Sequence, residues 1–418
     1  MGGPASPALL RVATAGSVDD GKSTLVGRLL HDTNSLLADQ MQAATVASRR
    51  RGLGDTDLAL VVDGLRAERE QGITIDVAFR HFATVHRAFV LADTPGHQQY
   101  TRNMVTGAST ADAVLVLVDA RHGLSEQSRR HVAVAALLRA PQIVLAINKM
   151  DLVDYAESTF DDIVREFAAF TRPLGIGPAM PIPISALHGD NVTERSARMP
   201  WYSGPPLLAH LETLTLPEPP PCGFRLAVQC VLRTGGGYRG YAGRVGAGRL
   251  RVGDRVTVLP SGATTVVRGI DGPDGSLAVA VAGQSVALRL ADQLDIARGD
   301  LLAVDPPPGG RVVTATVCWL ADRPMRVGDR LLVRHGTREL AAVAHAISGT
   351  LNLTTSEYIR ATELVANDLG RATIRLAEPV HPDPYRLSRN TGALLLLDPD
   401  SGATLGAGMV ERTEPEVR

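Results

Sequence analysis

The sequence is poor in lysine. Of its 43 basic residues only Lys22 and Lys149 are lysines, which leaves 41 arginines. Arginine can replace lysine at most surface positions, but not where a compact, flexible ammonium group is required. Both lysines fall inside two of the sequence motifs described below, and their retention supports those motifs independently of the pattern match.

Cysteine, long apolar runs and net charge are also scarce. The three cysteines, Cys222, Cys230 and Cys318, are too few and too scattered for a disulfide framework or a zinc site, so we expect them to be buried in a reducing compartment. No apolar run reaches the roughly 18 to 20 residues of a membrane span, and the N-terminus lacks the features of a signal peptide. A net charge of −1 provides no global attraction to nucleic acid or lipid. We expect a cytoplasmic protein.

The first half of the chain alternates apolar runs with amphipathic segments. The runs at 10–15, 88–92, 113–118 and 143–147 predict strands, and the segments 125–139 and 156–171 predict helices. This alternation is typical of a mostly parallel sheet covered by helices. Ligands of such sheets bind at the carboxyl ends of the strands.

Two proline-rich stretches, 217–221 (PEPPP) and 306–310 (PPPGG), predict linkers. Short β-rich runs punctuated by glycine follow each of them, which favours small barrels. We therefore predict an α/β domain over 9–216 and two small antiparallel β-barrels over 222–305 and 310–415.

A phosphate loop of the GxxxxGKS type follows the first predicted strand and opens a helix. Its backbone amides are expected to bind phosphates. Lys22 would neutralise the β and γ oxygens, and Ser23 would hold Mg²⁺. The alternative is an ordinary glycine-rich turn. The motif consists of Gly16, Ser17, Val18, Asp19, Asp20, Gly21, Lys22 and Ser23.

A second motif ends the predicted strand at 88–92. Asp93 would bind Mg²⁺ through water, and Gly96 would offer its amide to the γ-phosphate. His97 could orient the attacking water, with Val18 and Ile73 as an apolar gate; the alternative is a solvent-facing loop histidine. The motif consists of Asp93, Thr94, Pro95, Gly96 and His97.

A third and a fourth motif predict selection of guanine. The Asp151 carboxylate can accept hydrogen bonds from guanine N1–H and the 2-amino group together, whereas adenine offers neither donor, so the site is expected to choose GTP over ATP. Asn148 and Lys149 would line the base pocket, and backbone of the last motif would contact the guanine oxygen. The motifs are Asn148, Lys149, Met150, Asp151 and Ser185, Ala186, Leu187.

The segment GITID at 72–76 follows a helical stretch. Thr74 within it is placed to reach Mg²⁺ and the γ-phosphate, as a switch segment that orders with GTP. By itself a threonine between isoleucines is an ordinary strand residue, so this assignment depends on the neighbouring motifs. The fold class that they define is an α/β P-loop GTPase domain followed by two β-barrels.

These motifs in this order resemble the translational GTPases. AEREQGITID at 67–76 and WYSGP at 201–205 look like the archaeal and eukaryotic elongation factors. The stretches GSVDDGKSTLVGRLLHDT, ADTPGHQQYTRNMVTGAS, INKMDLVDY and RGYAGRVGAGRLRVGDRVTVLPSG look more like the GTPase subunit of sulfate adenylyltransferase. Elongation factors usually have histidine where Ser17 and Asp20 stand. The resemblance covers most of 10–305 and fades beyond it.

The resemblance implies that GTP hydrolysis, with Mg²⁺, is coupled to forming adenylyl sulfate and pyrophosphate from ATP and sulfate. A smaller partner subunit of the ATP-pyrophosphatase type would catalyse the adenylylation, in a heterodimer or larger assembly; this chain has no SGGxDS-like loop of its own. No second GxxxxGK[ST] follows the barrels, so a fused adenylyl-sulfate kinase is not expected. The stretch 233–238 (RTGGGY) departs from the Asn-Arg-Pro-like stretch of relatives, which puts a partner contact there in doubt.

Two other functions compete with this one. A translation factor delivering aminoacyl-tRNA should present a basic, aromatic-bearing face, and aromatic residues make up only 4% of this chain. A nucleotide-dependent switch could also serve only to assemble a partner. GTP hydrolysis that accelerates when the partner is added would argue against a purely structural role.

Overall fold

A computed structural model describes residues 9–36, 38–50, 58–62, 76–218, 220–235, 237–355 and 357–414. The chain divides into two compact units, each described here by itself. The first comprises Met1–Pro217 with Asn352–Glu357, and the second comprises Glu218–Leu351 with Tyr358–Arg418.

The first unit is built on a six-stranded sheet of order β2-β3-β1-β4-β5-β6, in which only the edge strand β2 is antiparallel to its neighbour. All seven residues of β4 are buried, as expected for an inner strand covered on both faces. The strands are β1 (Leu9–Ala15), β2 (Ala78–Ala83), β3 (Ala88–Asp93), β4 (Ala113–Asp119), β5 (Gln142–Asn148) and β6 (Met180–Pro183).

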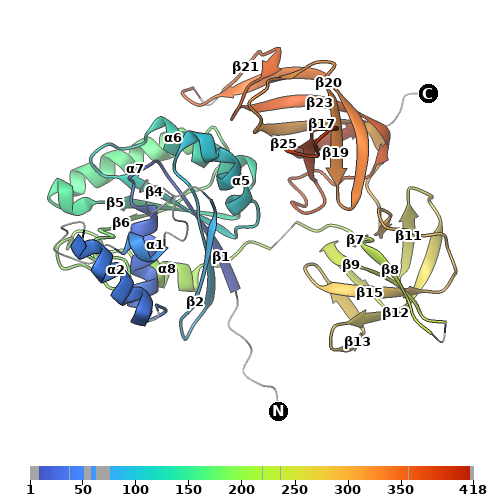
Figure 1. Ribbon diagram of the computed structural model, residues 1–418, viewed down its shortest axis with the longest axis horizontal. Coiled ribbons are helices and arrows are strands. Elements are labelled where there is room, and N and C mark those ends of the chain that lie inside the picture. Colours follow the sequence, from blue (N-terminus) through green and yellow to red (C-terminus); the bar gives the residue numbers. More distant parts are fainter. Residues whose placement is uncertain are drawn as a thin grey trace. The chain divides into compact units, whose positions relative to one another are not determined.

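Helices cover both faces of this sheet. Figure 1 shows α1 (Lys22–Asp32) and α8 (Leu207–Thr213) on one face, with α5 (Thr101–Ser109), α6 (Glu126–Leu137) and α7 (Glu157–Thr171) on the other. Ser125 caps α6 by accepting the Ser128 N–H. The shorter or peripheral elements are α2 (Ala38–Arg50), α3 (Ala59–Val62), η1 (Gln98–Tyr100) and η2 (Met150–Val153).

The second unit contains two closed six-stranded antiparallel barrels. In the first barrel the strands run in the order β11 (Arg255–Leu259), β16 (Leu301–Ala303), β7 (Arg225–Ala227), β9 (Arg239–Ala247), β15 (Ser285–Leu290) and β12 (Thr264–Gly272), and β12 returns to β11. Phe224 and Tyr241 are the largest side chains of its core. Its accessory strands are β8 (Cys230–Arg233), β10 (Arg249–Arg251), β13 (Gly275–Leu277) and β14 (Val279–Val281).

The second barrel closes in the same way, because β19 pairs with β20. Its strands in spatial order are β19 (Arg330–His335), β24 (Ala393–Leu397), β25 (Thr404–Glu414), β17 (Gly310–Trp319), β23 (Leu369–Val380) and β20 (Arg338–Asn352). The fully buried Trp319 anchors the core and donates its indole N–H to the Arg323 carbonyl at 2.8 Å. Its accessory strands are β18 (Met325–Arg326), β21 (Glu357–Ile359) and β22 (Glu363–Leu364).

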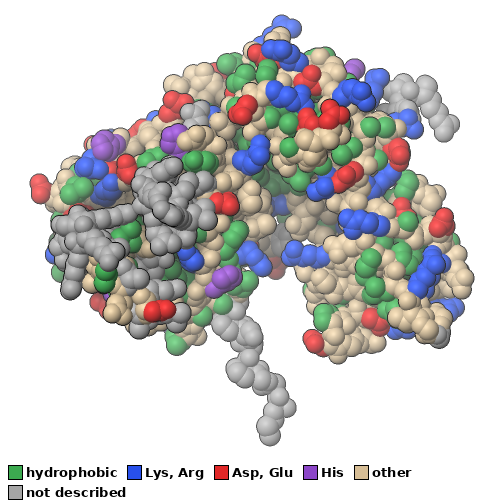
Figure 2. All heavy atoms as spheres, in the orientation of Figure 1, with side chains coloured by type: hydrophobic (Ala, Val, Ile, Leu, Met, Phe, Trp, Pro, Cys, Tyr) green, Lys and Arg blue, Asp and Glu red, His purple; other side chains and the backbone are tan. Residues whose placement is uncertain are grey.

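A buried ion pair joins the two barrels. The Arg225 guanidinium donates from Nε and Nη2 to the two oxygens of Asp383, at 3.1 and 3.0 Å. The Thr391 hydroxyl donates a hydrogen bond to the same carboxylate at 2.6 Å. Such a two-pronged contact fixes the orientation of the two side chains as well as their distance. On the face seen in Figure 2, acidic side chains lie among the basic ones of this unit.

The predicted fold class is confirmed, and the apolar runs coincide with β1, β3, β4 and β5. The three domain boundaries remain a prediction. The prediction of buried cysteines is wrong for Cys230, which is exposed because it lies on the accessory strand β8; Cys318 is buried and Cys222 partly so. Among the described residues, no helix is long and apolar enough to cross a membrane.

Candidate nucleotide-binding site

The phosphate loop connects β1 to α1 through a backbone that requires glycine. Gly21 stands at the N-cap of α1 with φ 90°, a left-handed conformation, and a Cβ there would lie 2.4 Å from Asn148 Nδ2. No side chain caps α1. The first amides of the helix therefore stay available to an anionic ligand.

Lys22 lies buried beneath this loop. Its ammonium group donates to the Ser17 carbonyl at 2.7 Å and to the Gly16 carbonyl at 3.4 Å. Burial lowers the pKa of Lys22, and the nearby Asp93 carboxylate opposes that shift. Two carbonyls of the loop thus contact the buried Lys22 ammonium group. They take the place that the motif predicts for the oxygens of a bound phosphate.

Oxygen ligands converge beside Lys22. The Ser23 hydroxyl donates to Asp93 Oδ2 at 2.9 Å, and the Thr14 hydroxyl donates to Asp93 Oδ1 at 2.9 Å. Mg²⁺ prefers hard oxygen donors and commonly uses one or two protein ligands together with phosphate oxygens and water. The adjoining hydroxyl and carboxylate of Ser23 and Asp93 fit that requirement.

The second motif approaches the phosphate loop closely at Gly96. A Cβ on Gly96 would lie 2.5 Å from Lys22 Nζ and 2.7 Å from the Ser17 carbonyl carbon, so no side chain fits. His97 follows, exposed, and its Nδ1 accepts the Gln99 N–H at 3.4 Å. Thr74 and Ile73 lie outside the described residues, so the predicted switch threonine and half of the predicted gate cannot be placed.

Asn148 ties the phosphate loop to the last motif. Its Nδ2 donates to the Asp20 carbonyl at 2.7 Å, and its Oδ1 accepts the Ala186 N–H at 2.9 Å. Arg28 of α1 holds the same loop from the other side, donating to the carbonyls of Ala186, at 3.1 Å, and Leu187. Three predicted motifs are therefore linked by direct hydrogen bonds.

Asp151 lies at the start of η2 with its side chain only 13% exposed. The His188 imidazole lies near it, with its Nε2 3.8 Å from Asp151 Oδ2. Beside it, the Lys149 ammonium group contacts Asp119 Oδ2 at 2.9 Å. Burial alone would raise the pKa of the Asp119 carboxyl, but hydrogen bonds from Arg121 and Lys149 hold it well below its usual range.

Sequence reasoning missed two residues that hold these loops, Asp119 and Arg28, and it assigned no separate role to the carboxylate of the predicted motif residue Asp20. Asp119 directly follows the apolar run of β4, as Asp93 follows β3, and that position is the signal that could have identified it. The Asp20 carboxylate accepts the Ser17 N–H and closes the turn of the phosphate loop. Burial raises the pKa of Asp20, and Lys22 opposes that shift.

A fully buried histidine lies behind the phosphate loop. Gly16 donates its backbone N–H to His131 Nδ1 at 3.0 Å. The proton of the neutral ring is therefore on Nε2, which lies 2.8 Å from the side-chain amide of Gln127. Because two donors cannot bond to each other, the Gln127 amide must turn its oxygen toward the ring. Burial lowers the pKa of His131 to about 3.

This shift predicts a loss of stability in mild acid. The folded protein keeps His131 neutral, whereas the unfolded chain protonates it below its ordinary pKa of 6.5. The contribution is complete above pH 6.5 and falls by about 1.4 kcal/mol per pH unit as the pH drops toward 3. Urea unfolding should be followed at pH 7.5 and 5.5 by helical circular dichroism, because every helix among the described residues lies in the first unit.

The control is His131→Asn, which cannot titrate. We expect the native protein to lose about 1.4 kcal/mol more than this variant between the two pH values. Equal losses in the two proteins would contradict a neutral, buried His131.

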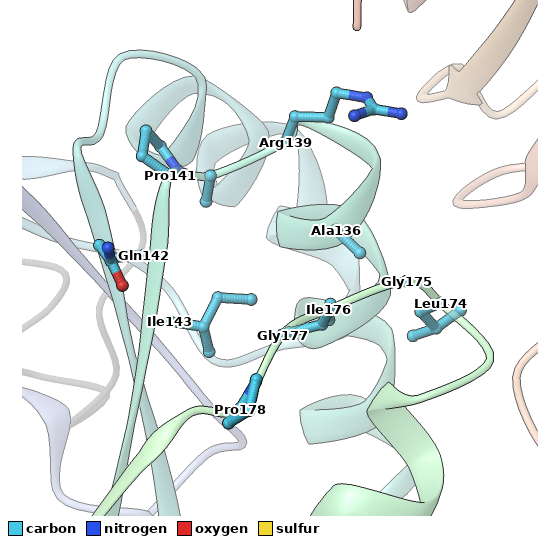
Figure 3. A pocket seen from close by; sticks show the side chains of 11 residues that line it. Ala136, Arg139, Pro141, Gln142, Ile143, Leu174, Gly175, Ile176, Gly177 and Pro178 are labelled. Atoms are coloured by element: carbon cyan, nitrogen blue, oxygen red, sulfur yellow. The ribbon is translucent and has the colours of Figure 1, made fainter. Parts of the chain in front are cut away.

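A separate pocket of about 370 Å³ lies at the amino ends of the strands, away from the carboxyl ends that carry the motifs (Figure 3). The loops that precede β5 and β6 form it, with Arg139, Gln142, Gly175 and Pro178 among its lining residues. Its lining residues, among the part of the chain that the structure describes, include none of the predicted nucleotide motifs. The nucleotide motifs follow the carboxyl ends of the strands, so this pocket has no part in the site described above.

The fold and these linked loops define a P-loop GTPase of the elongation-factor type. The family described as "Elongation factor Tu GTP binding domain" matches residues 8–230, more than half of the chain, and the chain belongs to it. A second family, "GTP-eEF1A C-terminal domain-like", matches residues 312–411.

Relatives that match nearly the whole of this chain narrow the family assignment further. "Sulfate adenylyltransferase subunit 1" of Laribacter hongkongensis is 46% identical, over 97% of this chain and 86% of the relative. "Bifunctional enzyme CysN/CysC" of Mycobacterium tuberculosis is 50% identical, over 97% of this chain and 67% of the relative. The chain is a member of the sulfate adenylyltransferase subunit 1 family, which confirms the resemblance and does not favour a translation factor.

A solved structure agrees at the level of the fold. The S. cerevisiae Ski7 GTPase-like domain, bound to GDP and inorganic phosphate, aligns with a TM-score of 0.54 over 97% of each chain at 17% sequence identity. At that identity the likeness supports the fold alone, and nothing about substrate.

Proposed function

We propose that this chain is the GTP-hydrolysing subunit of a sulfate adenylyltransferase. GTP hydrolysis would drive the formation of adenylyl sulfate and pyrophosphate from ATP and sulfate. The observation that carries the proposal is the hydrogen-bonded junction at Asn148, which links a phosphate loop to two guanine-type loops in a chain of this family.

GTP would bind across this junction. Lys22 would move from its carbonyl partners to the β and γ oxygens, together with amides of the phosphate loop. Gly96 would present its amide to the γ-phosphate. The Asp151 carboxylate would accept the guanine N1–H and 2-amino hydrogens, and the backbone at 185–187 would contact the guanine oxygen.

Hydrolysis requires an ordered water in line with the γ-phosphate. His97 would orient that water at the mouth of the phosphate loop, with Val18 beside it, and Thr74 would complete the site from the switch segment. Ser23 and Asp93 would hold Mg²⁺, which neutralises charge on the phosphates when bound. Since no arginine finger is identified, turnover of the isolated chain should be well below 1 s⁻¹.

Coupling to a second nucleotide has a thermodynamic reason. Adenylyl sulfate is a mixed anhydride of sulfate and phosphate, so its formation from ATP and sulfate is uphill on its own. Hydrolysis of GTP to GDP and phosphate releases free energy that can offset this cost. The adenylylation would take place in a smaller partner subunit of the ATP-pyrophosphatase type, as the word "subunit" in the relatives' name suggests.

The test is a reconstitution of the purified chain with the small subunit of its host. We expect pyrophosphate release that requires both ATP and sulfate and rises several-fold when GTP is added. GTP hydrolysis should rise in parallel. A reaction without sulfate, and one with the Lys22→Ala chain, serve as controls that should show no GTP-dependent increase.

GTP hydrolysis that does not respond to the other components would contradict the proposed coupling. GTP hydrolysis indifferent to the small subunit, ATP and sulfate would leave a GTPase without the proposed coupling. Aminoacyl-tRNA binding would then be the next assay.

A further inference from the structure

Helix α6 contacts the phosphate loop at two points, although it lies more than a hundred residues away in the sequence. His131 accepts the Gly16 N–H at 3.0 Å, at the entrance to the loop, over a separation of 115 residues. One turn earlier on the helix, the Ser128 hydroxyl donates to Asp20 Oδ2 at 3.4 Å, over a separation of 108 residues.

Both contacts act on parts of the loop that set its shape. The Asp20 carboxylate that Ser128 reaches also accepts the Ser17 N–H, the bond that closes the turn. The Gly16 N–H that His131 accepts is the first amide after β1. Because both contacts are buried, loss of the His131 acceptor or of the Ser128 donor would leave its partner in the loop without water to replace it.

The contacts of His131 keep its imidazole ring neutral, with the proton on Nε2 and the lone pair on Nδ1. Its ring is fully buried and its Nε2–H is directed at the Gln127 side chain at 2.8 Å. Only Nδ1 has a free lone pair, and that lone pair meets Gly16. On the other side of α6, Arg129 pairs with Glu166 of α7 at 2.6 Å, which anchors the helix against its neighbour.

We propose that His131 is a positioning residue for GTP, holding the phosphate loop in its binding conformation before the nucleotide arrives. The proposal rests on the GTP-binding function above. It deepens that function by placing part of the affinity in α6, outside every nucleotide motif. Fixing a loop in its bound shape raises affinity because less conformational freedom is lost on binding.

The test uses two side chains that imitate different nitrogens of the imidazole. The oxygen of asparagine can occupy the place of Nδ1 and accept the Gly16 N–H, whereas the terminal amide of glutamine extends to the place of Nε2. We expect His131→Asn to bind GTP within about threefold of the native chain. His131→Gln and His131→Leu should bind GTP and GDP about 10- to 100-fold more weakly, the range for a lost buried hydrogen bond.

Titration calorimetry of the full-length chain at pH 7.5 measures these affinities, and thermal unfolding checks that each variant is folded. His335→Leu is the matched control, because His335 is also a hydrogen-bonded histidine, partly buried and contacting the Thr391 carbonyl at 2.8 Å, but belongs to the second unit. Its affinity for GTP should be unchanged. Should the leucine variant fail to fold, the comparison of asparagine with glutamine still decides.

The outcomes separate the two proposals. A native chain that binds GTP, with asparagine and glutamine variants of equal affinity, would overturn the role of His131 and leave the GTPase intact. A native chain that binds no GTP would overturn the proposed function, and the role of His131 with it.

Discussion

Replacing Lys22 by alanine is expected to weaken GTP binding by about a thousandfold. The ammonium group is buried and donates to two carbonyls of the phosphate loop, from which it can turn to the oxygens of a phosphate bound at that loop. Two charge-assisted hydrogen bonds of roughly 2 kcal/mol each account for an effect of this size. Calorimetric titration of GTP into the purified chain measures it.

Arginine should not rescue this position, although it supplies 41 of the 43 basic residues. A single Cβ on Gly96 would already lie 2.5 Å from Lys22 Nζ, so the pocket has no room for a guanidinium group. Lys22→Arg is therefore expected to lose affinity about as fully as Lys22→Ala. Arg165→Ala, on the exposed side of α7, is the control and should bind normally. Retained affinity in either Lys22 variant would contradict the phosphate-loop assignment.

Replacing Asp151 by asparagine should change the preferred base from guanine to xanthine. The Asp151 carboxylate is mostly buried. A base that leaves the side chain at this position without a hydrogen-bond partner therefore binds much more weakly. An amide at this position can donate to the 2-oxo group of xanthine, but it meets the 2-amino group of guanine as donor to donor. Discrimination by a buried polar group of this kind is on the order of 10⁴-fold.

Competition binding with GTP and xanthosine triphosphate tests this reversal. Asp154→Asn is the matched control, because Asp154 lies three residues further along, is exposed, and stands outside the motif. It should keep the preference for GTP. An Asp151→Asn chain that still preferred GTP would show that another residue reads the base.

The elements that carry the site were predictable because each motif follows a buried parallel strand. Apolar runs define β3, β4 and β5 to within one residue, because an inner strand of a covered sheet is buried on both faces, and they define β1 equally well although Arg11 and Thr14 interrupt it. The carboxyl ends of those strands meet at one edge. Residues as distant as Asn148 and Asp20 could therefore be placed in one site from the sequence alone.

The contacts that brace the site were not predictable in the same way. His131 reaches Gly16 only because α6 packs across the sheet at a particular angle and height, and no local pattern encodes either. The bond from Arg28 to the backbone of Ala186 depends on carbonyl positions, which the side-chain sequence does not specify. The pairing of Arg225 with Asp383 likewise depends on how two separately closed barrels meet.

Because both lysines lie in the proposed nucleotide site, the reaction of lysine amines with an acylating reagent can be used to monitor that site. Lys22 is buried under the phosphate loop, and Lys149 is paired with Asp119 beside the guanine loops. No other lysine exists to consume an acylating reagent. Acylation of a side-chain amine in this sequence, whether by a laboratory ester or by a metabolic acyl donor, would therefore fall on one of the two lysines that we assign to the proposed GTP site.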